Sequence, residues 1–371
     1  MQESDLPGLT ATVLWAAFAL ALAFGAIAQR THFCTMGAVA DIVNLGDWTR
    51  MRMWVLAIGV AMIGFNAMVG AGWVEAADSI YAAPALLWLS NLVGGLLFGL
   101  GMVLASGCGS KTLVRVGGGN LKSLLVLFVL AVAAYATMRG VLAVARVATL
   151  DTVAVTLPAG QDLPSLLAHA TGVSRQWLAW AIGGGLGLAL VAWVLSRPEG
   201  RSGEVLLAGL GIGAVIVGVW WASGRLGFVP EHPVTLEESF LATNSRRMES
   251  LSFVAPVAYT MDWLILYSDT SRVLTLGIVT TLGVVFGSAC VALARGSFRW
   301  EGFAGTEDTA NHTVGALLMG VGGVTAMGCT VGQGLSGVST LALGSFIALG
   351  GILGGGVLGV RYLAWRVERS L

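Results

Sequence analysis

Long apolar runs separated by short polar stretches dominate this sequence. A helix needs about 20 apolar residues to cross the hydrocarbon core of a bilayer. Nine runs approach or exceed that length and predict membrane-spanning helices at 8–29, 53–74, 85–107, 121–145, 176–195, 205–222, 273–294, 311–330 and 338–360. A further segment, 252–270, is apolar but contains Asp262 and Asp269, so we expect it to be interfacial or re-entrant. The pattern predicts an all-α polytopic membrane protein.

Composition agrees with this interpretation. Of the 371 residues, 56% are hydrophobic and 11% are charged, whereas a soluble domain carries about a quarter charged residues. The formal net charge is zero, so nothing indicates a nucleic-acid partner, and the expected surroundings are the lipid bilayer. Acids at Glu3 and Asp5 precede the first apolar run, and we therefore expect no cleavable signal peptide, which would need a basic start.

Basic residues predict the orientation, because cytoplasmic loops of membrane proteins are enriched in Lys and Arg. The tail carries Arg361, Arg366 and Arg369, which places the C-terminus in the cytoplasm, and nine crossings then place the N-terminus outside. The loops alternate accordingly. Basic residues mark the inner loops (Arg50, Arg52, Lys122, Arg197, Arg201, Arg295), and acids mark the outer ones (Glu75, Asp78, Asp151, Asp162, Glu231, Glu237, Glu238).

The chain contains a copy of part of itself. "VGGLLFGLGMVLASGC" (93–108) and "VGALLMGVGGVTAMGC" (314–329) agree at 10 of 16 positions, with an offset of 221 and no gap. A weaker repeat relates residues 30–37 to residues 295–302, and in this alignment Arg299 occupies the position of Cys34. The predicted orientation makes the two copies cross in opposite directions, which is typical of transporters. We therefore expect one integral domain with repeat halves at about 8–145 and 273–371, joined by middle spans and an outer loop at 146–272.

Three of the four cysteines lie where glycine allows a helix to break. Cys34 lies in "HFCTMG", Cys108 in "ASGCGSKT" and Cys329 in "AMGCTVGQG". Irregular backbone at membrane depth is tolerated where it lines a cavity or is buried in protein, and a broken helix directs N–H groups at anions. A thiol is a soft, weak hydrogen-bonding group that suits a sulfur atom. Cys290, in "GSACVALA", lies in an unbroken run and is expected to be a packing residue.

These three thiols predict a substrate pathway for a sulfur-bearing anion. We expect them to stay neutral, because burial disfavours a thiolate and a thiolate would repel the anion. Each thiol would hold the substrate weakly and pass it on, as conduction requires. Arg30, Lys111, Arg115, Thr330 and Gln333 are the supporting candidates; the basic members of this group could equally be membrane anchors.

Other chemistries find no support in the sequence. The four histidines, at 32, 169, 232 and 312, show no metal-binding spacing. "SGCGSKT" has Ser110 where a phosphate-binding loop needs glycine, and no strand precedes it. We therefore expect no metal, no cofactor, no ATPase and no enzymatic activity.

Three segments resemble the YeeE/YedE family of sulfur-transport membrane proteins: "QRTHFCTMGAVADI", "GMVLASGCGSKTLVRVGGGNL" and "GCTVGQGLSGVSTLALGSF". The resemblance implies import of thiosulfate, or a related sulfur or selenium compound, across the bacterial inner membrane. It implies an hourglass of spans with buried central loops. It also implies a relay by S–H···S hydrogen bonds along Cys34, Cys108 and Cys329, and in some members a small cytoplasmic sulfur carrier of the TusA type. The long outer loop at about 223–251 and Lys111 depart from the shorter members.

One alternative stays open at this stage. The same cysteines could carry sulfur covalently, as a persulfide on a membrane enzyme or sensor. That chemistry needs a thiolate activated by a nearby cation, for which Arg30 and Lys111 are candidates. The sequence does not decide the driving force, the oligomeric state or the role of Cys290.

Overall fold

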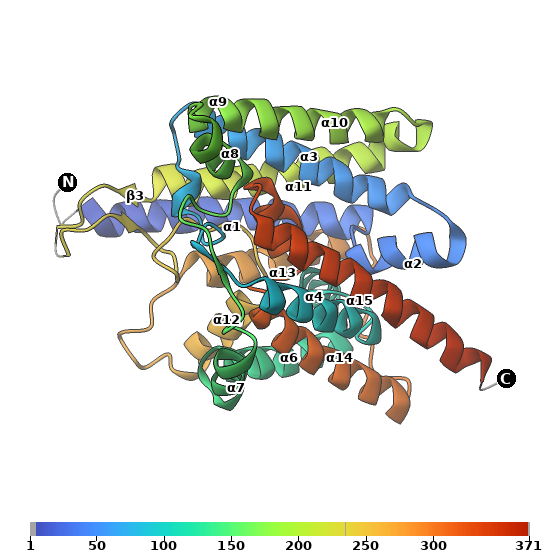
Figure 1. Cartoon of the computed structure of the whole chain (residues 1–371). Coiled ribbons are helices and arrows are strands. Elements are labelled where there is room, and N and C mark those ends of the chain that lie inside the picture. Colours follow the sequence, from blue (N-terminus) through green and yellow to red (C-terminus); the bar gives the residue numbers. More distant parts are fainter. Residues whose placement is uncertain (1–4, 234, 370–371) are drawn as a thin grey trace.

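The computed structural model describes residues 5–233 and 235–369, and the statements below refer to these residues. The protein is a bundle of roughly aligned helices (Figure 1). The longer helices are α1 (Leu6–Thr31), α3 (Thr49–Gly70), α4 (Trp88–Leu104), α6 (Leu121–Arg139), α10 (Gly185–Leu195), α11 (Gly203–Trp221), α13 (Leu276–Ala294), α14 (Thr306–Thr325) and α15 (Leu343–Glu368).

Shorter elements complete the chain. Short α-helices are α2 (Thr35–Leu45), α5 (Gly109–Gly117), α7 (Val141–Thr149), α8 (Leu163–Thr171), α9 (Arg175–Leu178) and α12 (Ala255–Ile265). Turns of 3₁₀-helix are η2 (Ala76–Asp78) and η4 (Pro198–Arg201), and π-helical turns are η3 (Ala179–Gly184), η5 (Ala222–Leu226) and η6 (Gly332–Gly337). Two antiparallel pairs join β1 (Ala85–Leu86) to β2 (Val155–Thr156) and β3 (Phe228–Val229) to β4 (Ser239–Phe240).

Eight helical segments are long and apolar enough to cross a membrane, among the residues described. They span Leu6–Leu45, Thr49–Gly70, Trp88–Gly117, Leu121–Arg139, Arg175–Leu195, Gly203–Leu226, Leu276–Ala294 and Leu343–Glu368. The ninth predicted span, 311–330, corresponds to α14, which begins with polar turns and is not among the eight. The span expected at 121–145 ends at Arg139, and an extended Gly140 separates it from α7.

The two ends of the bundle differ in charge. We call the end with Glu75 and Asp78, just after α3, the acidic end, and the end with Arg50 and Arg52, at the start of α3, the basic end. Helix α1 begins at the acidic end and α15 finishes at the basic end, on opposite sides of the molecule (Figure 1). Exposed tryptophans lie at both levels: Trp73 and Trp177 toward the acidic end, Trp48 and Trp193 toward the basic end. Tryptophan is enriched at both membrane interfaces, which fits a bundle of helices that spans a bilayer.

Helices α4 and α14 form the centre of the repeat, and their glycines pack reciprocally. A Cβ on Gly101 would lie 2.6 Å from the carbonyl oxygen of Gly315, and one on Gly315 would lie 2.6 Å from that of Gly101. Gly94 and Gly322 have the same relation, at 2.7 and 2.6 Å. The offset of 221 pairs Gly94 with Gly315 and Gly101 with Gly322. Each copy therefore packs on its own counterpart in antiparallel direction, as the inverted repeat predicts.

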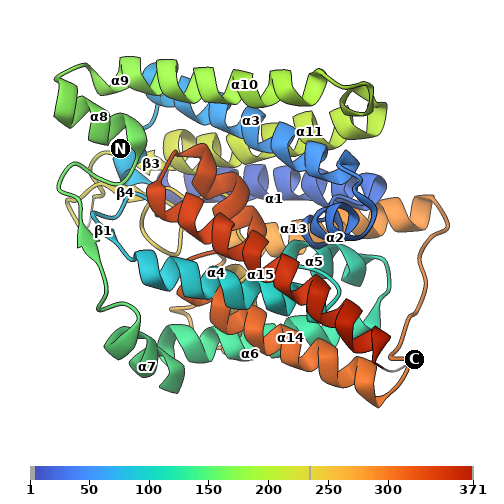
Figure 2. The ribbon, with the colours of Figure 1, turned by 45° about the vertical axis from the view of Figure 1, so that its right-hand side comes forward.

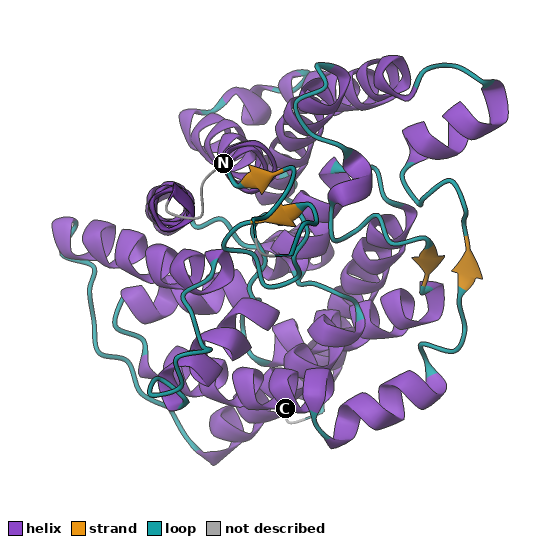
Figure 3. Ribbon diagram, turned by 90° about the vertical axis from the view of Figure 1, so that its left-hand side faces the viewer, coloured by secondary structure: helices purple, strands orange, loops and turns teal. Residues whose placement is uncertain are grey.

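The predicted outer loop is not a simple surface loop. After the β3–β4 pair the chain turns back into the bundle, and Met248, Leu251 and Phe253 become fully buried. The backbone of Met248 accepts a hydrogen bond from Ile80 and donates one to Asp78. Seen from the acidic end, loops and both strand pairs lie over the helices (Figure 3). The segment 245–254 thus covers the interior from this side, ahead of α12, which packs against α6 and α13.

Candidate functional site

The three cysteines share one local structure: a long helix ends three or four residues before the thiol, and a left-handed residue lies two residues before it. His32, Ser106 and Met327 have left-handed backbones, with φ of 53°, 57° and 58°. At the second and third breaks the same pair of backbone hydrogen bonds closes the helix: Ser106 to Val103 and Gly107 to Met102, then Met327 to Val324 and Gly328 to Gly323. This is the Schellman ending of an α-helix. A non-glycine residue in the left-handed region costs roughly 1–2 kcal/mol. The surrounding structure must therefore hold the backbone in this conformation at each of the three breaks.

Each thiol then occupies the start of a short helical segment. Cys34 is the N-cap of α2, and its sulfur accepts a hydrogen bond from the Gly37 N–H at 3.4 Å. Cys108 is the N-cap of α5, and its sulfur lies 3.3 Å from the Ser110 hydroxyl. The sulfur of Cys329 accepts from the Gly332 N–H at 3.4 Å. The thiols therefore stand at helix N-termini, where N–H groups and the helix dipole favour an anion.

The three sulfur atoms lie in the protein interior and not against lipid. Cys34 is 5% exposed, and Cys108 and Cys329 are fully buried. Cys108 interacts electrostatically with both of the others. The remaining thiol, Cys290, is exposed on α13. The expectation that Cys290 is a packing residue is therefore wrong, because its position on α13 faces outward and not into the core.

Phe253 joins the second and third breaks. Its backbone N–H faces the sulfur of Cys329. Its carbonyl oxygen lies 3.0 Å from the position of a Cβ on Gly109, the residue after Cys108. Its ring packs against Phe24 with centroids 5.6 Å apart. Sequence reasoning missed this residue, because it follows a polar loop and only the apolar letters of "LSFVAP" hint at burial.

Unpaired polar atoms surround the thiols. The hydroxyls of Thr35 and Thr330, next to Cys34 and Cys329, are buried without a hydrogen-bond partner among the described residues. Gln333 is 2% exposed; its Nε2 donates to the Ala326 carbonyl, whereas its Oε1 has no partner there. Buried polar groups are nearly always paired, so these atoms indicate a place for a polar ligand. Thr330 and Gln333 had been predicted as supporting residues, and Thr35 had not.

A polar basin of 420 Å³ opens beside the first two thiols at the basic end. His32, Lys111, Arg115, Lys122, Arg299 and His312 contribute its cationic or titratable nitrogen groups. The His312 ring nitrogen lies 3.0 Å from the Asp308 carboxylate. Lys122 is engaged by Asp308 at 2.9 Å and Glu301 at 3.7 Å. The remaining groups form no ion pair among the described residues, and Lys111 interacts electrostatically with Cys34 and Cys108. Figure 2 shows α2 and α5, the two short helices that begin at Cys34 and Cys108.

The predicted basic residues therefore divide into two groups. Lys111 and Arg115 line the basin. Arg30 is exposed in the last turn of α1 and does not line it, so its position is that of a membrane anchor. Arg299, which the weaker repeat aligned with Cys34, lines the basin instead of continuing the row of thiols.

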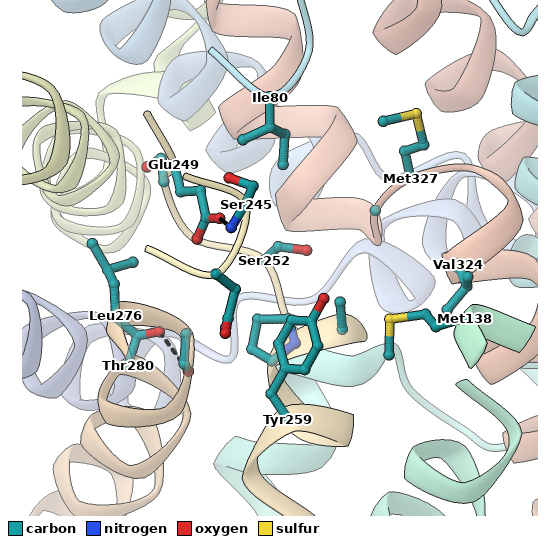
Figure 4. A pocket seen from close by; sticks show the side chains of 17 residues that line it. Ile80, Met138, Ser245, Glu249, Ser252, Tyr259, Leu276, Thr280, Val324 and Met327 are labelled. Carbon is teal, nitrogen blue, oxygen red and sulfur yellow. Dashed lines mark hydrogen bonds between the residues drawn. The ribbon is translucent and has the colours of Figure 1, made fainter. Parts of the chain in front are cut away.

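A second cavity, of 240 Å³, opens at the acidic end, and we call it the outer cavity. Its lining includes Met327 and Gly328, the two residues before Cys329, and Ser252, the residue before Phe253. Glu249 and Tyr259 face it from the covering segment and from α12 (Figure 4). Residues that precede Cys329 thus line the outer cavity, and residues that precede Cys34 and Cys108 line the basin at the other end.

Comparisons with known proteins find a matching family and similar transporters. A family model described as sulphur transport matches residues 30–358. The chain is 26% identical to the thiosulfate transporter TsuA of Escherichia coli over 351 residues, covering 92% of this chain and 91% of that protein. It is 25% identical over 357 residues to TsuA of Spirochaeta thermophila, covering 91% and 94%. A probable transporter, YedE of Salmonella typhimurium, is 29% identical over 100 residues, covering 26% and 23%.

Proposed function

Because this chain belongs to the sulphur transport family and is a multi-pass membrane transporter, we propose that it imports thiosulfate or a closely related sulfur anion. The acidic end would face outside and the basic end the cytoplasm of a bacterial inner membrane, as the positive-inside rule favours. The observation that carries the proposal is that three buried thiols stand at helix N-termini, and that residues next to them line a cavity at either end of the bundle.

Thiosulfate is a dianion with one sulfur end and one sulfonate end, and the site offers a partner for each. Neutral S–H groups of Cys329, Cys108 and Cys34 would donate weak hydrogen bonds to the sulfur end in turn. The unpaired hydroxyls of Thr330 and Thr35 would serve the sulfonate oxygens. Weak binding at several successive sites allows entry and release, which conduction requires.

The charge distribution favours movement toward the basic end. Lys111 and Arg115, unpaired at the inner mouth, attract an anion that has reached Cys108, because Coulomb attraction is strong where the surroundings exclude water. The wider basin then lets it hydrate and leave. A small soluble sulfur carrier of the TusA type would receive the sulfur compound at this mouth.

Uptake of radiolabelled thiosulfate into proteoliposomes tests the proposal, with sulfate as the matched competitor. Sulfate has the same charge and nearly the same shape, but an oxygen replaces the terminal sulfur. We expect thiosulfate uptake that a large excess of sulfate does not block. Equal transport of both anions would contradict a pathway built for sulfur.

The second candidate function is a covalent persulfide carrier, and the position of Lys111 near Cys34 and Cys108 favours it, since a cation stabilises a thiolate. A thiolate would take the terminal sulfur of thiosulfate and release sulfite. Mass spectrometry of the protein after exposure to thiosulfate separates the two. Unmodified cysteines together with net uptake support the importer; a persulfide without net uptake supports the carrier.

A further inference from the structure

The outer cavity contains a carboxyl group that a pathway for anions does not need. Glu249 lines this cavity beside Ser252 and Tyr259 (Figure 4). Its side chain accepts a hydrogen bond from the Ser245 N–H at 2.7 Å. Its own carbonyl oxygen accepts one from the Ser223 hydroxyl. The backbone and the carboxyl are therefore both held in place in a cavity that Met327 and Gly328, the residues before Cys329, also line.

No cation neutralises this carboxyl among the described residues. On its own segment, Arg246 and Arg247 are exposed, and the Arg247 guanidinium donates to the Ala77 carbonyl. Two tyrosines also interact electrostatically with the Glu249 carboxyl: Tyr81, in the loop before β1, and Tyr259, on α12.

The charged groups farther along these elements are separate from Glu249. On α12, Asp262 pairs with Arg272 at 3.2 Å. Arg139 of α6 lines a smaller neighbouring cavity that shares Tyr259 with the outer cavity. The other two walls of the outer cavity, from α13 and α14, are neutral: Leu276 and Thr280 on α13, Gly323 and Val324 on α14.

The surroundings favour the protonated form of this acid. Burial raises the pKa of Glu249 above its ordinary value, and hydrogen bonds from Ser245 and Asn244 oppose that shift only in part. The neighbouring tyrosine stays neutral, because burial and the Glu249 charge raise the pKa of Tyr259. The outer cavity therefore has one carboxyl group whose charge changes at a higher pH than that of an ordinary glutamate.

We propose that Glu249 links anion entry to a proton: the sulfur anion occupies the outer cavity when the Glu249 carboxyl is protonated, and the carboxylate excludes it. The inference deepens the proposed import function and rests on it. A dianion and a carboxylate confined to a cavity of 240 Å³ repel each other. A protonated carboxyl has an O–H to donate instead. By linkage, an anion that binds only the protonated form is taken up with one proton.

The experiment measures the KM for external thiosulfate in proteoliposomes as the external pH rises at fixed internal pH. Above the carboxyl's pKa, the wild-type KM is expected to rise about tenfold per pH unit, because one proton must bind with each anion. Glu249→Gln mimics the protonated carboxyl, so its KM should stay low and independent of pH. Glu249→Asp should keep the slope. Glu237→Gln, which changes an exposed acid of the same outer loop, is the matched control and should behave as wild type.

A Glu249→Gln variant with the wild-type slope overturns the inference and leaves the import function intact. Absence of thiosulfate uptake at every pH defeats the import function instead. In that case infrared titration of the purified protein decides the inference. The protonated carboxyl band that Glu249→Gln lacks should titrate at a higher midpoint when thiosulfate is present, and an unchanged midpoint overturns the proposal.

Discussion

Cys329→Ser is expected to separate folding from transport. The sulfur of Cys329 caps a helical segment by accepting the Gly332 N–H at 3.4 Å, and the Phe253 N–H faces it. Serine is among the best N-cap residues, so the variant should be as stable as wild type or up to about 1 kcal/mol more stable. Alanine at this position leaves the facing N–H groups without an acceptor, which costs about 1–3 kcal/mol.

Transport should respond in a different order. The serine oxygen can cap the helix but cannot make the soft contact with a substrate sulfur. A neutral hydrogen bond contributes about 1 kcal/mol net, and losing that contact at one obligatory site slows the relay about fivefold or more. We therefore expect the serine variant to be at least as stable as wild type, and the alanine variant to be less stable than the serine variant. Both variants should transport thiosulfate more slowly than wild type.

The assay is initial uptake of radiolabelled thiosulfate into proteoliposomes at matched protein content, with thermal unfolding of each purified variant. Cys290→Ser is the control, because that thiol is exposed on α13 and outside the row. It should match wild type in both measurements. Wild-type uptake by Cys329→Ser would refute the relay, and an alanine variant as stable as the serine one would refute the capping argument.

Three further predictions follow from other parts of the structure. Thr330→Val removes a buried hydroxyl that has no partner among the described residues, so thiosulfate KM should rise while the melting temperature does not fall; an unchanged KM would count against a role in binding. Gly101→Ala places a Cβ 2.6 Å from the Gly315 carbonyl oxygen and should lower the melting temperature, whereas Gly350→Ala, with open space around it, should not. Hydrogen bonds from the Ala304 N–H and Lys122 hold the pKa of Asp308 below its usual value. The stability that Asp308 contributes is fully present above the pKa of the unfolded state, about 4, and is lost as the pH falls through the lower pKa of the folded state. Asp308→Asn should therefore remove that part of the acid sensitivity, as measured by thermal unfolding.

The membrane-spanning helices could be predicted because their signal is local. An apolar run of sufficient length must form a helix in a bilayer, and each of the nine predicted runs coincides with a helix of the structure. Two runs differ from the prediction. The run 121–145 is divided at Gly140, and α14 is not among the eight membrane-spanning segments because it begins with polar turns that contain Glu307 and Asp308. The inverted repeat was visible for a similar reason, since its glycines and terminal Gly-Cys recur at one offset. The reciprocal contact of Gly101 with Gly315 gives that offset its physical meaning.

The candidate site could be predicted only in part. A helix break is predicted from residues next to each other in the chain, so Cys34, Cys108 and Cys329 could be chosen from their neighbours. Phe253 could not, although it lies in the apolar segment 252–270, because its contact with the residue after Cys108 joins segments far apart in the chain. Arg30 and Arg115 look alike in the sequence, yet only Arg115 lines the basin.

The sequence alone determined that this chain crosses a membrane many times, that two of its segments are copies, and that three thiols lie at breaks, because hydrophobic length, repetition and glycine act on neighbouring residues. Only the tertiary structure decided what surrounds those thiols. Whether a Thr330 hydroxyl finds a partner, or Glu249 meets a cation, depends on which distant segment packs beside it, and that is set by the close packing of the whole bundle.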